Sequence, residues 1–138
     1  MKNLLLMLTV LAFGILSPSA FAEEGLEKKQ FSRVVASRTN QRIGFYTALN
    51  PDCTAQQGNF TVRVTKKPEH GSVETIDTMN FPSYPKENIR AKCNQHKVKG
   101  ILVNYKSEDK YVGSDELDLL VLFPAGFAWE VHYDISVR

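Results

Sequence analysis

The three histidines are the first residues in this sequence that could bind a metal ion or transfer a proton. They are His70, His96 and His132, and none has the i, i+4 spacing or the tight Cys/His spacing of a zinc site. His96 follows Cys93 by three residues, but a disulfide at that cysteine would remove its sulfur as a metal ligand. The spacing therefore favours solvent-facing histidines, and we predict no metal and no other cofactor.

Serines and carboxylates could supply hydrolytic chemistry, but their local patterns do not support it. Ser72 and Ser114 lie outside a G-x-S-x-G elbow or any other recognisable nucleophile turn. Acidic side chains gather at residues 108–109 and 115–118, in turn and strand-edge contexts where solvated surface charge is the usual outcome. We therefore predict no catalytic residue and no enzyme activity. A small hydrolase or a metal-handling protein is the least favoured alternative.

The first 22 residues have the pattern of a secretory signal peptide. Lys2 precedes an apolar run over residues 4–16, and the following segment ends at Ala22 in the small-x-small pattern that signal peptidase requires. A membrane anchor is the weaker alternative, because this run is shorter than the roughly 20 residues that span a bilayer. We expect cleavage after Ala22, no membrane span, and a periplasmic or secreted protein.

Export determines how the two cysteines are interpreted. Cys53 and Cys93 would reach an oxidising compartment, where an even number of cysteines usually means pairing. They are forty residues apart and lack the C-x-x-C spacing that tunes a redox-active thiolate. We predict one structural disulfide between them.

Length and charge limit the number of domains and the class of partner. The chain has 17 Lys and Arg against 15 Asp and Glu, spread without a basic block, whereas nucleic-acid binding needs a concentrated positive face. Without the signal peptide, the chain has the size of one domain. We predict a flexible charged tail over residues 23–30, one domain over residues 31–138, and no nucleic-acid partner.

Period-two alternation of apolar and polar residues predicts strands through most of this domain. It is clearest at residues 129–137, where Trp129, Val131 and Tyr133 alternate with polar neighbours. The other candidates are residues 31–37, 42–49, 60–65, 72–76, 101–105 and 117–123. Seven short strands without a convincing amphipathic helix predict an all-β antiparallel sandwich of two sheets, with a small barrel as the alternative.

Residues 77–92 depart from the alternation and contain Pro82 and Pro85, so we expect a long connection there instead of a central strand. Loops at the end of a rigid scaffold often carry function. Phe81 and Tyr84 are therefore the candidate ligand-binding residues, for a protein or a glycan of the cell envelope. The alternative is that both rings fold back as a lid over the core.

Three leucines are predicted to point to the outer face of a sheet, where side chains normally meet water and polar residues are expected. Leu120 and Leu122 alternate with the apolar face of residues 117–123, and Leu102 stands between two apolar neighbours. If their strands are adjacent, the three leucines form one interaction patch, which could bind a partner or support weak self-association. Otherwise the N-terminal segment or the 77–92 connection covers them.

Several motifs, taken in order from residue 57 to residue 137, resemble bacterial immunoglobulin-like or cadherin-like domains. They are Pro68-Glu69-His70-Gly71-Ser72-Val73, Gly100 with Tyr105, Tyr111-Val112-Gly113-Ser114-Asp115, and the alternating closing strand. The family pattern is a P-x-H-G-x-V turn, an apolar strand ending in Tyr, and a Y-x-G-x-D corner. Leu117 stands where the family usually has Phe, and the acidic clusters that bind calcium between cadherin repeats have no counterpart. The resemblance implies an immunoglobulin-like sandwich and a role in adhesion, surface display or ligand holding.

The same motif residues also have a direct physical interpretation. Gly71 and Gly113 suit turn positions with positive φ, and Asp115 can accept backbone N–H groups at the start of its strand. The sequence as a whole predicts an exported, non-catalytic binding or adhesion module of the cell envelope. The main alternative is a structural or assembly subunit that associates through its strand edges.

Overall fold

The computed structural model describes residues 25–138 and contains seven strands and one short 3-10 helix. In chain order they are β1 (Leu26–Val35), β2 (Asn40–Tyr46), β3 (Thr61–Lys66), β4 (Gly71–Asn80), η1 (Ala91–Gln95), β5 (Val98–Ser107), β6 (Gly113–Leu122) and β7 (Ala128–Val137). The all-β prediction with seven strands is confirmed. The predicted signal peptide over residues 1–22 lies outside the described residues.

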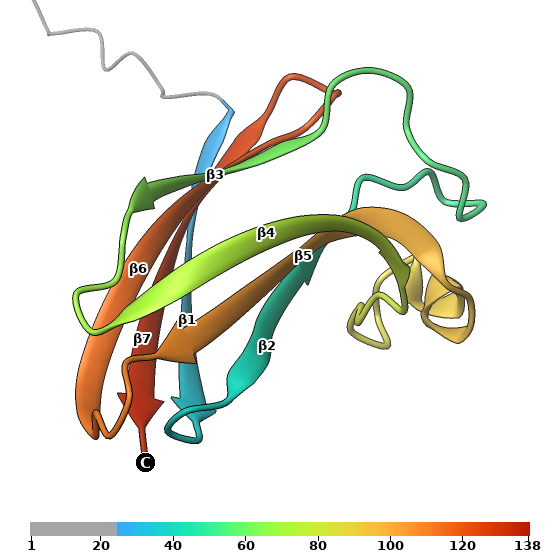
Figure 1. Cartoon of the computed structure of the whole chain (residues 1–138). Helices are drawn as coiled ribbons and strands as arrows, with labels where there is room; N and C mark the ends of the chain where they lie inside the picture. Colours follow the sequence, from blue (N-terminus) through green and yellow to red (C-terminus); the bar gives the residue numbers. More distant parts are fainter. Residues whose placement is uncertain (1–24) are drawn as a thin grey trace, which may run out of the picture.

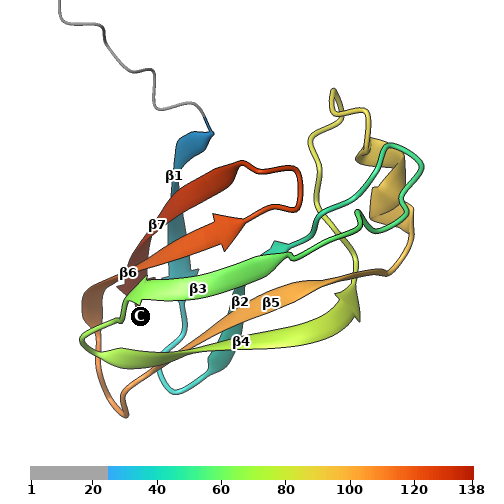
Figure 2. The same ribbon diagram turned by 90° about the horizontal axis from the view of Figure 1, so that it is seen from above.

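The strands form the two sheets of a sandwich (Figures 1 and 2). The four-stranded sheet has the order β1-β7-β6-β3, and the three-stranded sheet has the order β2-β5-β4. All neighbouring strands are antiparallel except β1 and β7, which run parallel. The expectation of purely antiparallel sheets is therefore wrong for this pair. Each sheet ends in two edge strands, β1 and β3 in one and β2 and β4 in the other.

Strand β1 corrects the prediction of a flexible tail over residues 23–30 from Leu26 onward, whereas residues 23 and 24 lie outside the described residues. It pairs with β7 from Leu26 opposite Ala128 to Val35 opposite Val137. Its first half carries charged side chains, which hid the strand from a search for apolar alternation. Backbone pairing holds such an edge strand, and Lys29 adds a contact with its ammonium 5.2 Å from the centre of the Trp129 ring.

The main core lies between the sheets and comes from alternate positions of the three central strands. Its largest fully buried side chains include Tyr105 of β5, Leu117 and Leu119 of β6, and Tyr133 and Ile135 of β7. The alternation predicted for the last strand is confirmed, since Val131, Tyr133, Ile135 and Val137 are each at most 2% exposed.

The predicted single patch of Leu102, Leu120 and Leu122 is wrong. Leu102 belongs to β5 in the three-stranded sheet, whereas Leu120 and Leu122 belong to β6 in the four-stranded sheet. All three leucines alternate with core residues and are half-buried, so they lie on the two opposite outer faces of the sandwich. Strands β5 and β6 follow each other in sequence but cross from one sheet to the other.

The motif residues meet at one end of the sandwich. Asp115 is 6% exposed, and its two carboxylate oxygens accept the backbone N–H groups of Glu69 at 2.9 Å and His70 at 3.1 Å. The Tyr105 hydroxyl donates to the same carboxylate at 2.7 Å. The predicted bond to a backbone N–H at the start of its strand is confirmed, since Asp115 accepts the N–H of Glu116 at 2.9 Å. The bonds from Glu69, His70 and Tyr105 were not predicted, and they connect the turn before β4 to both sheets.

The two glycines of this region have different reasons to be glycine. Gly113 has a φ of 148°, so its predicted positive φ is confirmed. Gly71 is not among the positive-φ residues, and the prediction for it is wrong. A Cβ atom at Gly71 would lie 2.6 Å from the Tyr105 ring, so close approach of backbone and ring requires glycine there.

Candidate functional site: the disulfide-linked loop end

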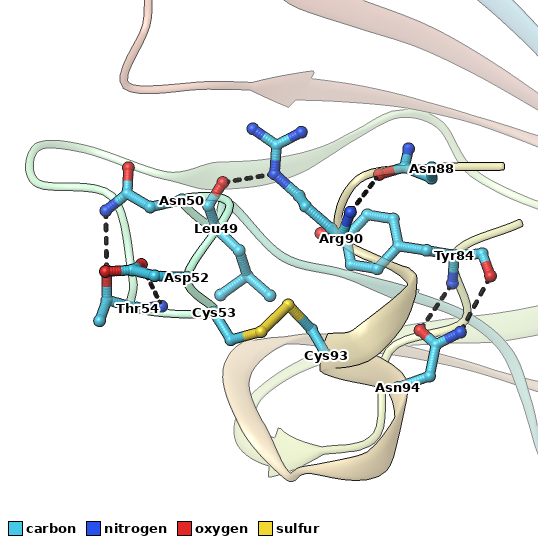
Figure 3. The surroundings of a disulfide bond; sticks show 10 residues. All are labelled: Leu49, Asn50, Asp52, Cys53, Thr54, Tyr84, Asn88, Arg90, Cys93 and Asn94. Atoms are coloured by element: carbon cyan, nitrogen blue, oxygen red, sulfur yellow. Dashed lines mark hydrogen bonds between the residues drawn. A yellow bond between two sulfur atoms is a disulfide. The ribbon is translucent and has the colours of Figure 1, made fainter. Parts of the chain in front are cut away.

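One end of the sandwich is built from two long loops that a disulfide joins. Cys53 lies in the loop between β2 and β3, and Cys93 lies in η1 within the connection between β4 and β5. The two cysteines are bonded with a Cα–Cα distance of 5.4 Å (Figure 3). The predicted pairing is confirmed. Figures 1 and 2 show both loops beyond the same end of the strands.

Hydrogen bonds fix the two loops further (Figure 3). Arg90 Nε donates to the Leu49 carbonyl at 2.7 Å, which links the connection to the other loop a second time. Asn94 bonds Tyr84 reciprocally, since its Oδ1 accepts the Tyr84 N–H and its Nδ2 donates to the Tyr84 carbonyl, both at 2.9 Å. The loops are therefore organised before any ligand arrives, which lowers the entropic cost of binding.

A second, small hydrophobic cluster lies beneath these loops. Its buried members are Leu49, Cys93 and Val98, and the partly buried Tyr84 packs against them. Burial raises the pKa of the Tyr84 phenol above its usual value. Tyr84 thus has the fold-back position that was the alternative to a binding role, while its part in ligand binding stays a prediction.

Phe81 lies on the solvent side of the same connection. Its side chain is 44% exposed, and the Lys97 ammonium is 5.8 Å from its ring centre. Two further large apolar residues of this region are exposed, Met79 at 55% and Ile89 at 68%. Sequence analysis did not select these two, because it chose only aromatic side chains of the connection as ligand-binding candidates. The structure therefore separates the predicted pair into an exposed Phe81 and a half-buried Tyr84.

Two of the three histidines, which the sequence predicted to face solvent, contact other side chains. His132 lies on the outer face of the four-stranded sheet, with Nδ1 2.5 Å from Asp118 and Nε2 3.3 Å from Asp134. The hydrogen bond to Asp118 is the main reason that the pKa of His132 is raised. The His70 ring stacks on Tyr111 with centroids 4.1 Å apart, while His96 is exposed.

Metal binding and membrane insertion were checked over the residues that the structure describes. Within residues 25–138, no group of three or more His, Cys, Asp or Glu side chains is arranged to hold a metal ion. No helix in that part of the chain has the length and apolar character needed to cross a bilayer.

Comparisons with known proteins add no family assignment. No protein-family model matches this chain, and no curated protein matches its sequence. The functional argument therefore depends on the sequence and the geometry alone.

Proposed function

We propose that this protein is an exported, non-catalytic binding or adhesion module of the cell envelope, which recognises a protein or a glycan through its disulfide-linked loop end. The observation that carries the proposal is the exposure of Phe81 and Ile89 on a connection that the disulfide and Arg90 anchor, with the exposed Met79 near the end of the adjoining strand β4. Exposed apolar side chains on pre-organised loops are typical of recognition surfaces. The Phe81 ring can stack on a sugar ring or pack against a peptide.

The disulfide supports the exported location. Such bonds form and persist in oxidising compartments, which agrees with the signal-peptide pattern of residues 1–22. We place the protein in the periplasm or outside the cell. The two-sheet fold is compatible with membership of the bacterial immunoglobulin-like domains, and we include that membership in the proposal.

The test compares the exposed Phe81 ring of the loop end with an exposed apolar side chain elsewhere on the protein. Purified protein is incubated with peptidoglycan sacculi, a glycan array and immobilised envelope proteins, and the bound fraction is measured for Phe81→Ala and for the wild type. We expect Phe81→Ala to reduce binding about fivefold or more without changing the circular dichroism spectrum. Val112→Ala is the control, because Val112 is a 67% exposed apolar side chain in the connection between β5 and β6, outside the two joined loops.

Two results would contradict the proposal. One is equal binding by the wild type and Phe81→Ala to every probe that binds. The other is the absence of binding to all three probe classes. If Phe81→Ala unfolds, the Phe81 ring contributes to the stability of the fold, and its effect on binding cannot be measured. Ile89→Ala, at the 68% exposed position, then takes its place in the same binding test.

A second function, assembly through a strand edge, is favoured by one observation. Natural sheets protect their edges with lysines, prolines, bulges or short strands. Strand β1 carries Lys28 and Lys29, β2 has a register shift between Arg42 and Gly44, and β3 has only six residues. Strand β4 has ten residues in unbroken register with β5, contains neither lysine nor proline, and carries only Glu74 and Asp77 as charged side chains.

A long edge without lysine, proline or a bulge could pair with a strand of another chain, most favourably with one that carries basic side chains opposite Glu74 and Asp77. The test uses two matched exposed threonines, one on β4 and one on the β3 edge. Thr75→Lys should abolish concentration-dependent association in sedimentation velocity, whereas Thr65→Lys should not. A wild type that stays monomeric at every concentration and captures no envelope protein would exclude this second function.

A further inference from the structure

The open side of the sandwich between the edge strands β1 and β2 contains a cleft with a volume of about 390 Å³. The side chains that determine its chemistry are Phe31, Arg33, Arg42, Phe45, Tyr46 and Tyr133. This volume lies within the usual range for small-molecule sites. Ser83, next to the exposed loop residues, also lines the cleft, but the other residues come from the strands.

Arg33 projects from β1 into the cleft and is held in place. Its Nε donates to the Ile43 carbonyl at 2.8 Å and its Nη1 donates to the Ser32 carbonyl at 2.9 Å. The guanidinium has five N–H groups, so these two bonds leave donors free. Its central carbon is 5.2 Å from the Phe31 ring centre and 5.5 Å from the Tyr133 ring centre.

Arg42 reaches the cleft from β2, in the other sheet. Its guanidinium carbon is 5.5 Å from the Phe45 ring centre. Among residues 25–138, no carboxylate lies within 4.0 Å of Arg42 or Arg33, although three lysines form ion pairs and two histidines contact carboxylates. Two positive charges thus share one cleft without a negative partner from the described part of the chain.

Two tyrosine hydroxyls form the inner wall of the cleft. The hydroxyl oxygens of Tyr46 and Tyr133 are 2.6 Å apart, and their side chains are 7% and 1% exposed. One proton is used in the bond between them, so the other hydroxyl proton remains available as a donor. Gly44 allows this arrangement, because a Cβ atom there would lie 2.4 Å from the Tyr133 hydroxyl oxygen.

Electrostatics connects both arginines to these hydroxyls. Burial is the largest cause of the raised pKa of Tyr133, so the hydroxyl stays protonated at neutral pH. The positive charges of Arg33 and Arg42 both lower the pKa of Tyr133, and the charge of Arg33 also lowers the pKa of Tyr46. Both guanidinium groups are therefore within electrostatic reach of the same phenol.

From these contacts we propose that the cleft binds the carboxylate of a small organic acid, with the flanking rings of Phe31 and Phe45 contacting the body of the ligand. Apart from the Ser83 hydroxyl, which can donate or accept, the polar side-chain groups available to a ligand are the two guanidinium groups and a tyrosine hydroxyl proton, which are all donors. An Arg fork matches the two oxygens of a carboxylate, and charge-assisted bonds of this type are stronger than neutral ones. The site adjoins the loop end, because Ser83 lines the cleft and Phe45 also packs on the cluster beneath the loops. Its two guanidinium groups and its tyrosine hydroxyls come from the strands and not from the loop-end surface.

The test uses pairs of probes that differ only in charge or in the acid group. The purified protein, labelled with nitrogen-15, is titrated with benzoate and benzamide, and with glucuronate and glucose. We expect benzoate to shift the resonances of Gly44 and its strand neighbours with a dissociation constant of about 1 to 10 mM, and benzamide to cause no saturable shift. The glucuronate and glucose pair distinguishes an acidic sugar from an aromatic acid as the preferred ligand.

Variants assign the effect to the cleft. Arg42→Gln removes an exposed charge that makes no hydrogen bond within residues 25–138, and we expect it to weaken benzoate binding about fivefold or more. Arg63→Gln removes the same charge from the exposed edge strand β3 and should leave binding unchanged. Phe81→Ala should also leave it unchanged, which separates this site from the proposed loop-end function.

Four outcomes would overturn the proposal. The first three are equal shifts with each acid and its neutral partner, an unchanged affinity in Arg42→Gln, and no saturable shift with benzoate or glucuronate up to about 50 mM, where even weak single-site binding is measurable. If Arg42→Gln and Arg63→Gln weaken binding equally, the effect is one of net charge and the cleft is not a site.

Discussion

At the scale of single residues, the hydrogen bonds of the Asp115 carboxylate explain why an acidic residue stands at the end of the Tyr111-Val112-Gly113-Ser114-Asp115 motif. The carboxylate accepts two backbone N–H groups from the turn before β4 and the hydroxyl of Tyr105. The sequence could predict an acceptor at Asp115, because Asp commonly bonds nearby backbone groups in turns. It could not predict Tyr105 as a partner, since that residue belongs to the other sheet. The requirement for glycine at residue 71 follows from the same unpredicted ring.

We predict that Asp115→Ala destabilises the protein more than Tyr105→Phe. The first change leaves several partly buried donors without an acceptor and should lower the free energy of unfolding by about 3 kcal/mol or more. The second removes a single bond to a charged group and should cost about 1.5 to 3 kcal/mol. Urea denaturation measures both. A loss below about 1 kcal/mol for Asp115→Ala would show that the carboxylate is not a structural acceptor.

His132 should make stability depend on pH near neutrality. The hydrogen bond to Asp118 raises the folded-state pKa, so folding favours the protonated ring. This contribution is complete below the unfolded pKa of about 6.5 and is lost as the pH rises through the higher folded-state value. The pKa of Asp134 is lowered, so its contribution is lost only at acid pH, outside that window.

We therefore expect the thermal midpoint of the wild type to fall between about pH 6 and about pH 8.5 by more than that of His132→Gln. His96→Gln, at an exposed position, is the control and should follow the wild type. Parallel curves for the wild type and His132→Gln would contradict the prediction. A titration of the His132 ring by NMR gives the direction of the shift independently.

At the scale of elements, alternation located the strands that contribute to the core and missed the part of β1 that is held by pairing with β7. Residues 26–30 carry charges that obscure the pattern, yet they continue the parallel register. The prolines predicted a connection at residues 77–92, but β4 extends to Asn80 because residues 77–80 pair with residues 98–101 of β5. The 3-10 helix was not predicted either, since only five residues form it.

We predict that removal of the disulfide loosens the loop end before the sandwich. The closed loop spans 40 residues, and the double variant Cys53→Ala with Cys93→Ala should lose about 4 kcal/mol on the chain-entropy model. Hydrogen exchange should accelerate first in residues 47–60 and 81–97. Arg90→Ala, which removes one bond between the same loops, should cost about 1 kcal/mol. Uniform loss of protection across β5, β6 and β7 would show instead that the disulfide stabilises the whole core.

At the scale of the whole molecule, alternation shows which side chains face inward but not which strands share a sheet. That is why Leu102 was grouped with Leu120, although their strands lie in opposite sheets. The same limit hid the arginine cleft, because Arg33 and Arg42 come from edge strands of different sheets. By contrast, Phe81 could be selected from its proline-rich surroundings alone.

The two faces of β6 provide the last prediction, which compares two double variants. Leu117 and Leu119 are at most 1% exposed, so changing both to Thr leaves cavities and buried hydroxyl groups. We expect each substitution to lower the free energy of unfolding by about 3 kcal/mol. That loss approaches the total stability of a small domain, and we expect a largely unfolded protein. Leu120→Thr with Leu122→Thr changes the outer face, where both leucines are half-buried, while Thr retains high β-propensity.

We expect the outer variant to stay folded and to lose about 1 kcal/mol or less in urea denaturation. The reason is that the outer positions border long polar side chains, with Leu120 placed between Arg63 of β3 and Glu130 of β7. These side chains can cover the shorter Thr without leaving a void. If the outer variant unfolds as the inner one does, a further segment of the chain or a second molecule must pack on this face, and the sandwich is not complete with two layers.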